Sequence, residues 1–193
     1  MSYERRDRCA ALIKADAQAN WGGGVRGIVG LLTTVRGNSL LLMRLSHAAG
    51  RRLPLLGHLL KQMNHVWSGA DIAWQARIGR GFQLFHPTGV VIGPGVRIGA
   101  QCVVQQGVTL GGFGGEGGSA VDAPSPVLAD DVFIGAGARL FGAISVGARA
   151  RIGANAVVLK DVPSDATAVG VPARLIEPAS GHRLSDTTTS EGE

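Results

Sequence analysis

One histidine and one aspartate of this sequence are spaced for acid–base chemistry. Of the five histidines, only His86 lies inside a long stretch of six-residue repeats, at a point where their spacing slips by two residues. Asp71 precedes it by 15 residues, close to the 18 residues that three repeats contain. A histidine that a carboxylate orients can act as a general base toward a hydroxyl group. We therefore predict that His86 is a general base oriented by Asp71; the alternative is a turn histidine and a capping aspartate.

The repeats around these residues have an aliphatic side chain at every sixth position. A glycine often follows the aliphatic residue, and a small or β-branched residue often lies four positions after it. Neither the period of two of a half-buried strand nor the 3.6-residue period of a helix explains this pattern. The phase survives the glycine-rich stretch between Leu110 and Leu128, which are three repeats apart. The aliphatic positions are Ile72, Ile78, Leu84, Ile92, Ile98, Val104, Leu110, Leu128, Ile134, Leu140, Val146, Ile152 and Val158.

A six-residue period predicts a parallel β-helix. Each repeat supplies a short strand and a turn with its aliphatic residue pointing inward, and three repeats make one triangular coil. The coils then stack at the ~4.8 Å spacing of hydrogen-bonded strands. Glycine makes up 30 of the 193 residues, which suits a chain with many tight turns. A core built from contacts between neighbouring coils also suits a chain in which only 5% of residues are aromatic.

The first third of the chain has a helical pattern instead. Apolar side chains at helical spacing predict helices within residues 25–66, with Gly50 at the end of one helix and Pro54 at the start of the next. The fold class is therefore mainly β, with a short α-helical region in front. The division that we predict is a helical N-terminal region (1–66), a β-helix (67–176) and a polar C-terminal segment (177–193) expected to be disordered.

The composition argues against several classes of protein. No apolar run reaches the ~18 residues of a membrane span, and the polar start lacks the apolar segment of a secretion signal, so we expect a cytoplasmic protein. Residues 1–66 carry a net charge of +7 within a total of +5. These charges are scattered without an aromatic stacking platform, which argues against nucleic-acid binding. Cys9 and Cys102 lie far apart, which argues against a disulfide scaffold or a thiolate zinc site.

Seven motifs between residues 38 and 176 are typical of one family. They are RLSH (44–47), GADI (69–72), HPTGVVIG (86–93), GVTLGG (107–112), IGAGARLFG (134–142), IGANAVVLKDVP (152–163) and GVPARLI (170–176). Together they resemble hexapeptide-repeat acyltransferases, and in particular the short forms of bacterial serine O-acetyltransferases. The resemblance implies a left-handed parallel β-helix, acetyl-CoA as acetyl donor, and assembly as a homotrimer or a dimer of trimers. It also implies that His86 and Asp71 are the general base and its orienting partner in acetyl transfer to a hydroxyl.

A binding site for the donor follows from the same likeness. Backbone groups of turns rich in glycine and alanine would contact an extended CoA arm in the groove between two β-helices, and the small side chains would let the arm approach. Lys160, in KDVP, and Arg174, in GVPAR, are candidates for binding its phosphates. The candidate turn residues are Gly111, Gly135, Ala136, Gly137, Gly153 and Ala154.

The acceptor side departs from the family pattern. Typical serine acetyltransferases have an aspartate immediately before the catalytic histidine, where it helps hold the ammonium group of serine; here that residue is Phe85. They also have an Arg-His pair in the following loop, whereas residues 111–126 contain no basic residue. Asp122 or Glu116 could replace one counter-charge, and we take Phe85 and Asp122 as acceptor-binding candidates. The acceptor stays open between L-serine and a sugar or another small alcohol, with weak binding expected for a zwitterion.

Two other functions are compatible with a hexapeptide repeat. The γ-type carbonic anhydrases share this fold but need three metal-binding histidines, and the repeats contain only His86, so we expect no metal site. A non-catalytic scaffold or an inactive paralogue is the second alternative. The presence of both His86 and Asp71 argues against it, and an assay of acetyl-CoA turnover would distinguish it from an enzyme.

Overall fold

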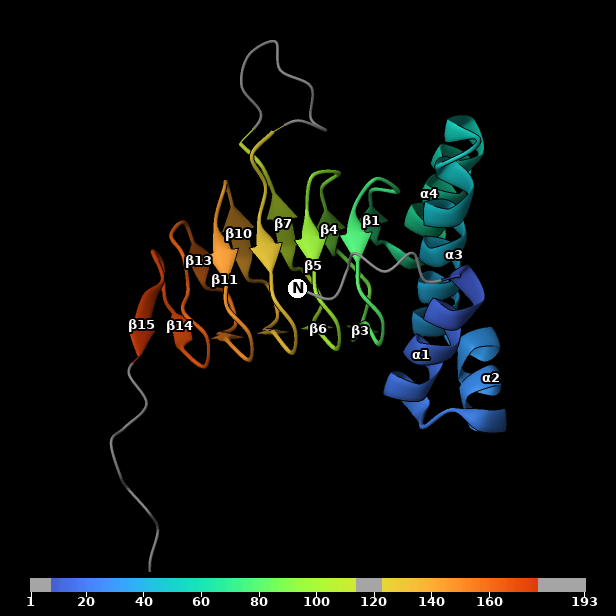
Figure 1. Cartoon of the computed structure of the whole chain (residues 1–193), viewed down its shortest axis with the longest axis horizontal. Coiled ribbons are helices and arrows are strands. Elements are labelled where there is room, and N and C mark those ends of the chain that lie inside the picture. The colour runs from blue at the N-terminus through green and yellow to red at the C-terminus, as the bar shows by residue number, and fades with distance from the viewer. Residues whose placement is uncertain (1–7, 114–122, 177–193) are drawn as a thin grey trace, which may run out of the picture.

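The computed structural model describes residues 8–113 and 123–176, and in them a group of helices lies at one end of a long coil of short strands (Figure 1). The helices are α1 (Cys9–Trp21), α2 (Gly24–Thr33), α3 (Val35–Gly50) and α4 (Pro54–Ser68). The expectation of helices within residues 25–66 is confirmed. Helix α1 adds to them on the N-terminal side, and α4 continues to Ser68.

The helix boundaries follow from local chemistry. Helix α3 ends at Gly50 and α4 starts at Pro54, as the sequence predicts; proline suits a first helical position because its missing N–H would have no partner there. The hydroxyl of Thr34 caps α3 by accepting the N–H of Gly37 at 3.0 Å. Gly69 ends α4 with a φ of 74°, a left-handed conformation that glycine adopts without steric cost.

The rest of the described chain is a succession of short strands. They are β1 (Asp71–Ile72), β2 (Arg77–Ile78), β3 (Gln83–Leu84), β4 (Val91–Ile92), β5 (Arg97–Ile98), β6 (Val103–Val104), β7 (Thr109–Gly111), β8 (Val127–Leu128), β9 (Phe133–Ile134), β10 (Arg139–Phe141), β11 (Ser145–Val146), β12 (Arg151–Ile152), β13 (Val157–Val158), β14 (Thr167–Val169) and β15 (Arg174–Ile176). They form three sheets, in the orders β1-β4-β7-β10-β13, β11-β8-β5-β2 and β15-β14-β12-β9-β6-β3. Every pairing is parallel except that of β14 with β15, so the strands wind as a three-sided coil (Figure 1).

The six-residue period is confirmed by the strand register. Along the five-stranded sheet, Ile72, Ile92, Leu110, Leu140 and Val158 pair in succession, and each is at most 2% exposed. The small or β-branched residues that lie four positions after most of the aliphatic residues, such as Val96, Val132 and Ala150, are buried in the same core. Each coil therefore buries its apolar side chains against the coils before and after it, which is how so few aromatic residues suffice.

The register also shows how irregular segments are accommodated. Ile98 pairs with Leu128, so the phase continues across the long loop between them as predicted. The antiparallel strand β15 is a feature that the period does not predict. It covers the edge of β14 at the end of the coil, and a covered edge cannot pair with another chain.

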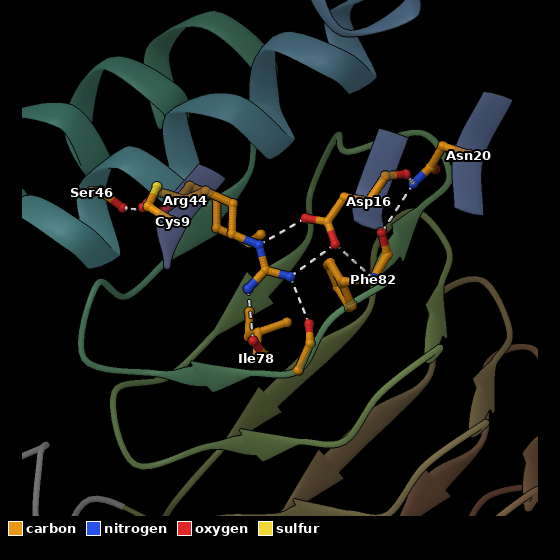
Figure 2. Close-up of polar contacts among 9 residues, drawn as sticks. Cys9, Asp16, Asn20, Arg44, Ser46, Ile78 and Phe82 are labelled. Atoms are coloured by element: carbon orange, nitrogen blue, oxygen red, sulfur yellow. Dashed lines mark hydrogen bonds and ion pairs between the residues drawn. The ribbon is translucent and has the colours of Figure 1, made fainter. Parts of the chain in front are cut away.

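A buried ion pair fastens the helices to the first coil (Figure 2). The guanidinium of Arg44 binds the carboxylate of Asp16 through two N–H groups, at 2.7 and 3.0 Å, and donates to the carbonyls of Ile78 and Gly79 at 2.7 and 2.6 Å. The carboxylate also accepts the N–H of Phe82 at 3.0 Å. Desolvation raises the pKa of Asp16, while Arg44 and the hydrogen bonds oppose this shift. The pair thus joins α1, α3 and the β2–β3 turn.

His47, in the same RLSH motif, has a structural position too. His47 is 7% exposed, and its Nε2 lies 3.2 Å from the carbonyl oxygen of Ala73, just after β1. Burial, aided by the positive charge of Arg44, lowers the pKa of His47 to about 3. The ring is therefore neutral at physiological pH, and its Nε2–H donates to the Ala73 carbonyl.

Within residues 8–113 and 123–176, no single helix is long and apolar enough to cross a membrane. Helices α2 and α3, which bend by 89° at their junction, meet the length and composition criteria only as a pair.

Candidate functional site

His86 lies in a turn that is two residues longer than the turn stacked on it. Leu84 pairs with Val104, whereas Ile92 pairs with Leu110, so the β3–β4 turn has two more residues than the β6–β7 turn. The backbone of Thr88 and Gly89 keeps the stacking hydrogen bonds to the neighbouring coils, to Gly107 and Gly69. His86 is exposed and has a φ of 55°, a left-handed conformation uncommon for residues other than glycine. The register slip therefore turns an imidazole out of the coil wall toward solvent.

Asp71 is the first residue of β1 and lies beside Val91, the first residue of β4. It therefore lies at the same corner of the three-sided coil as the β3–β4 turn that carries His86. Its Oδ1 forms an ion pair of 2.5 Å with Nζ of Lys61 on α4. Among the described residues, neither Oδ2 of Asp71 nor the ring of His86 has a hydrogen-bond partner. The fold thus brings the two residues to one corner, and Lys61, rather than His86, contacts the carboxylate.

The turns that lead from the six-stranded to the five-stranded sheet stack into one column, which we call the turn column. It consists of residues 85–90, 105–108, 135–138 and 153–156. Hydrogen bonds join successive turns: the N–H of Gly107 donates to Thr88, that of Gly137 to Gln106, and that of Asn155 to Ala136. His86 and most of the predicted CoA-binding residues therefore share one edge of the coil, at a spacing of ~4.8 Å per coil.

Most backbone N–H groups of the predicted CoA turns are already used for stacking. Those of Gly135 and Gly153 donate to carbonyls of the next coil at 2.8 Å, and that of Ala136 donates to Oε1 of Gln105 at 3.1 Å. Only the N–H of Ala154, among these turn residues, has no acceptor within the described chain. A Cβ on Gly135 would lie 2.7 Å from the nitrogen of Ala154, so close coil stacking alone requires glycine at position 135.

The remaining predicted donor residues lie apart from these turns. Gly111 ends β7, and Lys160 is exposed just after β13. Arg174 is exposed at the start of β15, directly after the turn of residues 170–173 that joins β14 to β15. Within one chain, the structure does not bring Lys160 and Arg174 to His86.

The acceptor candidates differ in what can be described. Asp122 and Glu116 lie outside the described residues. Phe85 is half-buried and directly precedes His86, and the guanidinium of Arg36 lies over its ring at 4.8 Å from the centroid. The same guanidinium lies 4.6 Å from the ring centroid of Trp21.

Arg36, Trp21 and Lys61 are neighbours of the site that sequence reasoning missed. All three are carried by helices, far from the repeats in sequence, and no spacing links them to His86 or Asp71. Only the docking of the helices on the first coil brings them there. Among the described residues, no group of three or more His, Cys, Asp and Glu side chains has a geometry that could hold a metal ion.

The chain is similar in sequence to bacterial serine acetyltransferases. It is 45% identical to that of Synechococcus elongatus over 126 residues, which cover 65% of this chain and 50% of the relative. It is 44% identical to that of Helicobacter pylori (strain J99) over 140 residues, which cover 72% of this chain and 80% of the relative. The chain thus spans about half the length of the first relative and most of the second. No family model matches it.

Solved structures share its fold. The serine acetyltransferase of Neisseria gonorrhoeae superposes with a TM-score of 0.79 at 34% identity, over 88% of this chain and 65% of that one. The soybean serine acetyltransferase complexed with serine gives 0.78 at 36% identity, over 87% and 69%. A serine acetyltransferase in complex with CoA gives 0.76 at 34% identity, over 87% and 69%. The expected left-handed parallel β-helix is confirmed by this likeness.

Proposed function

Because the chain belongs to the serine acetyltransferase family of hexapeptide-repeat acyltransferases, we propose that it transfers an acetyl group from acetyl-CoA to a hydroxyl of a small acceptor. The solvent-facing imidazole of His86, at one end of the turn column, is the observation that carries this proposal. Relatives crystallised with CoA and with serine support the donor and a small hydroxyl acceptor. The acceptor itself is L-serine, a sugar or another alcohol.

The reaction needs one proton acceptor and one nucleophile. The imidazole of His86 takes the proton of the acceptor hydroxyl as that oxygen attacks the thioester carbonyl. The new C–O bond forms, the C–S bond breaks, and the thiolate of CoA receives the proton back from the imidazolium. Direct attack of this kind needs no residue of the chain to carry the acetyl group.

Asp71 acts as the positioning residue for His86 in this proposal. Lys61 pairs with Oδ1 of Asp71, which leaves Oδ2 able to accept the Nδ1–H of the imidazole once the acceptor orders the ring. The ion pair holds the carboxylate in place. Asp71→Asn should therefore lower kcat less than His86→Ala, because it removes only the orienting partner.

The donor lies along the turn column in this proposal. Turn residues 135–137 and 153–154 lie two and three coils from His86, about 10 to 15 Å away along the coil axis. The N–H of Ala154, which has no acceptor among the described residues, is a donor for an amide carbonyl of the CoA arm, and the exposed Lys160 and Arg174 bind phosphates. These two cations do not approach His86 within one chain, which supports a groove shared between neighbouring chains.

A homotrimer would form such grooves, with a dimer of trimers as the larger alternative. Helix α4 also exposes Leu59, Met63 and Trp67, which are 52%, 56% and 63% exposed, on a face suited to contact between copies. Light scattering at micromolar concentration measures the assembly, and a monomer would contradict it.

The test of the function is a release of thiol from acetyl-CoA with a panel of acceptors. His86→Ala should lower kcat by ~10²–10⁴ and leave the KM for acetyl-CoA nearly unchanged. His58→Ala, which removes an exposed histidine of α4, is the matched control and should change neither. Wild-type turnover in His86→Ala would overturn the assignment of the base. No turnover with any acceptor would favour the non-catalytic scaffold.

A further inference from the structure

The guanidinium of Arg36, a residue of helix α3, lies beside the turn that carries His86. The guanidinium of Arg36, in the first turn of α3, lies over the rings of Trp21 and Phe85, and Phe85 directly precedes His86. One of its nitrogens, Nη2, donates to the carbonyl oxygen of Asn20 at 3.3 Å. The side chain thus extends from the helical region to the turn that carries His86.

The positive charge of Arg36 is not neutralised within the described chain. A guanidinium has five N–H donors, and the described residues provide a partner for only one of its nitrogens. The carboxylates of Asp16 and Asp71 have other partners: Asp16 binds Arg44, and Asp71 binds Lys61. The first turn of α3 contains no acidic residue. Partial burial lowers the pKa of Arg36, but an arginine stays charged at neutral pH. The described part of the chain therefore leaves a partly desolvated cation with N–H donors that it does not pair.

The two rings hold this cation in place. A Cβ on Gly30 would lie 2.5 Å from the Trp21 ring, so α2 packs directly against that ring and fixes it. A guanidinium that lies over aromatic rings is attracted to their π faces and keeps the N–H groups at its edge available. The arrangement therefore presents a rigid, planar donor, which matches the geometry of a carboxylate.

We propose that Arg36 binds the carboxylate of the hydroxyl acceptor and so selects acceptors that carry one; this rests on the proposed acetyl transfer at His86. The cation that the loop of residues 111–126 lacks then comes from helix α3. An aspartate in place of Phe85 would pair with Arg36 and remove its charge, whereas the phenyl ring holds the guanidinium and leaves it free for a ligand. Phe85 and Arg36 thus determine acceptor specificity together.

The same residues predict which carboxylated acceptors are used. Position 85 offers an aromatic ring where the family has an aspartate for the ammonium of serine, so an ammonium group gains no ion pair there. Hydroxy acids should therefore be acetylated at least as well as the corresponding amino acid. This expectation distinguishes recognition of the carboxylate by Arg36 from a general preference for serine, which would favour the amino acid over the hydroxy acid.

The experiment compares acceptors that differ only in the carboxylate: glycerate with glycerol, and L-serine with 2-amino-1,3-propanediol. We expect the wild-type kcat/KM to favour the carboxylated member of each pair, with glycerate at least as good as L-serine. Arg36→Gln should raise the KM for glycerate and L-serine about 10- to 100-fold, as for a lost charge-assisted hydrogen bond. The KM for acetyl-CoA, glycerol and 2-amino-1,3-propanediol should not change.

Two further variants complete the test. Arg36→Lys keeps the charge without the planar fork and should recover part of the lost preference. Arg26→Gln, which removes an exposed arginine of α2, should behave like the wild type. A purely structural role for Arg36 would lower the thermal midpoint without separating the two classes of acceptor, and that result would overturn the proposal.

The outcomes also distinguish this inference from the function on which it rests. If carboxylated and neutral acceptors are both acetylated and Arg36→Gln leaves their ratio unchanged, the Arg36 proposal is wrong and acetyl transfer stands. If neither the wild type nor Arg36→Gln acetylates any acceptor, the proposed function itself fails, and the assignment of Arg36 fails with it.

Discussion

The helical region and the β-helix each contain a two-pronged ion pair between arginine and aspartate. In the helical region, Arg44 and Asp16 are each 1% exposed, and in the β-helix Arg149 and Asp165 are 61% and 58% exposed. The contacts have similar lengths, with 2.7 and 3.0 Å in the first pair and 2.6 and 2.7 Å in the second. Their consequences should differ, because water solvates the exposed charges when the pair breaks and cannot solvate the buried ones.

The two regions are therefore stabilised in different ways. The β-helix is stabilised by apolar side chains that contact the coils on either side, as Ile134 does between Val104 and Ile152. The helices meet the first coil through a desolvated polar cluster centred on Arg44 and Asp16 (Figure 2). The comparison teaches that apolar stacking alone builds the coil, whereas the junction with the helices combines buried apolar side chains, such as Leu40 and Met43, with a buried ion pair.

The largest effect should come from breaking the buried pair. Asp16→Asn leaves the Arg44 guanidinium buried without a counter-charge and should lower the free energy of unfolding by about 3–5 kcal/mol. Asp165→Asn makes the same chemical change in the exposed pair and should leave the unfolding midpoint unchanged within error. Urea titrations followed by circular dichroism measure both. Equal effects of the two substitutions would contradict the distinction between the regions.

A smaller effect should follow from a cavity in the β-helix. Ile134 is 0% exposed, and Ile134→Ala should cost about 3 kcal/mol, through lost apolar burial and an unfilled cavity. Leu159→Ala, on a side chain that is 48% exposed, is the matched control and should cost less than ~0.5 kcal/mol. Urea titrations measure both values. A cost for Ile134→Ala as small as that of Leu159→Ala would show that the stacked core contributes little.

The smallest effect should appear as a pH dependence that belongs to the helical region. His47 has a pKa of about 3 in the folded chain, and its ordinary value is 6.5, so below pH 6.5 the unfolded chain binds a proton that the folded chain does not. Folding stability should therefore fall as the pH drops, by about 2 kcal/mol between pH 7 and pH 5. Thermal midpoints of the wild type and of His47→Gln measure this loss, which the variant should not show. Parallel pH curves would contradict the role of His47.

The sequence alone determined the β-helix and its core. A repeat of six residues can be recognised because each strand contacts only its neighbours in the stack, so the same demand for an inward aliphatic side chain recurs in every coil. The break between α3 and α4 was also predictable, since Gly50 and Pro54 act on their own backbone. The slip at His86 was visible in the same way, as an interruption of the period.

Only the tertiary structure decided what surrounds His86 and how the helices are joined to the coil. Arg36 at Phe85, Lys61 at Asp71 and Asp16 at Arg44 are contacts between segments that share no period. The reach and direction of a long charged side chain depend on how whole helices dock, which local backbone preferences do not specify. Contacts that repeat in every coil produce a period that can be recognised in the sequence, whereas a single polar contact between distant segments produces no sequence pattern.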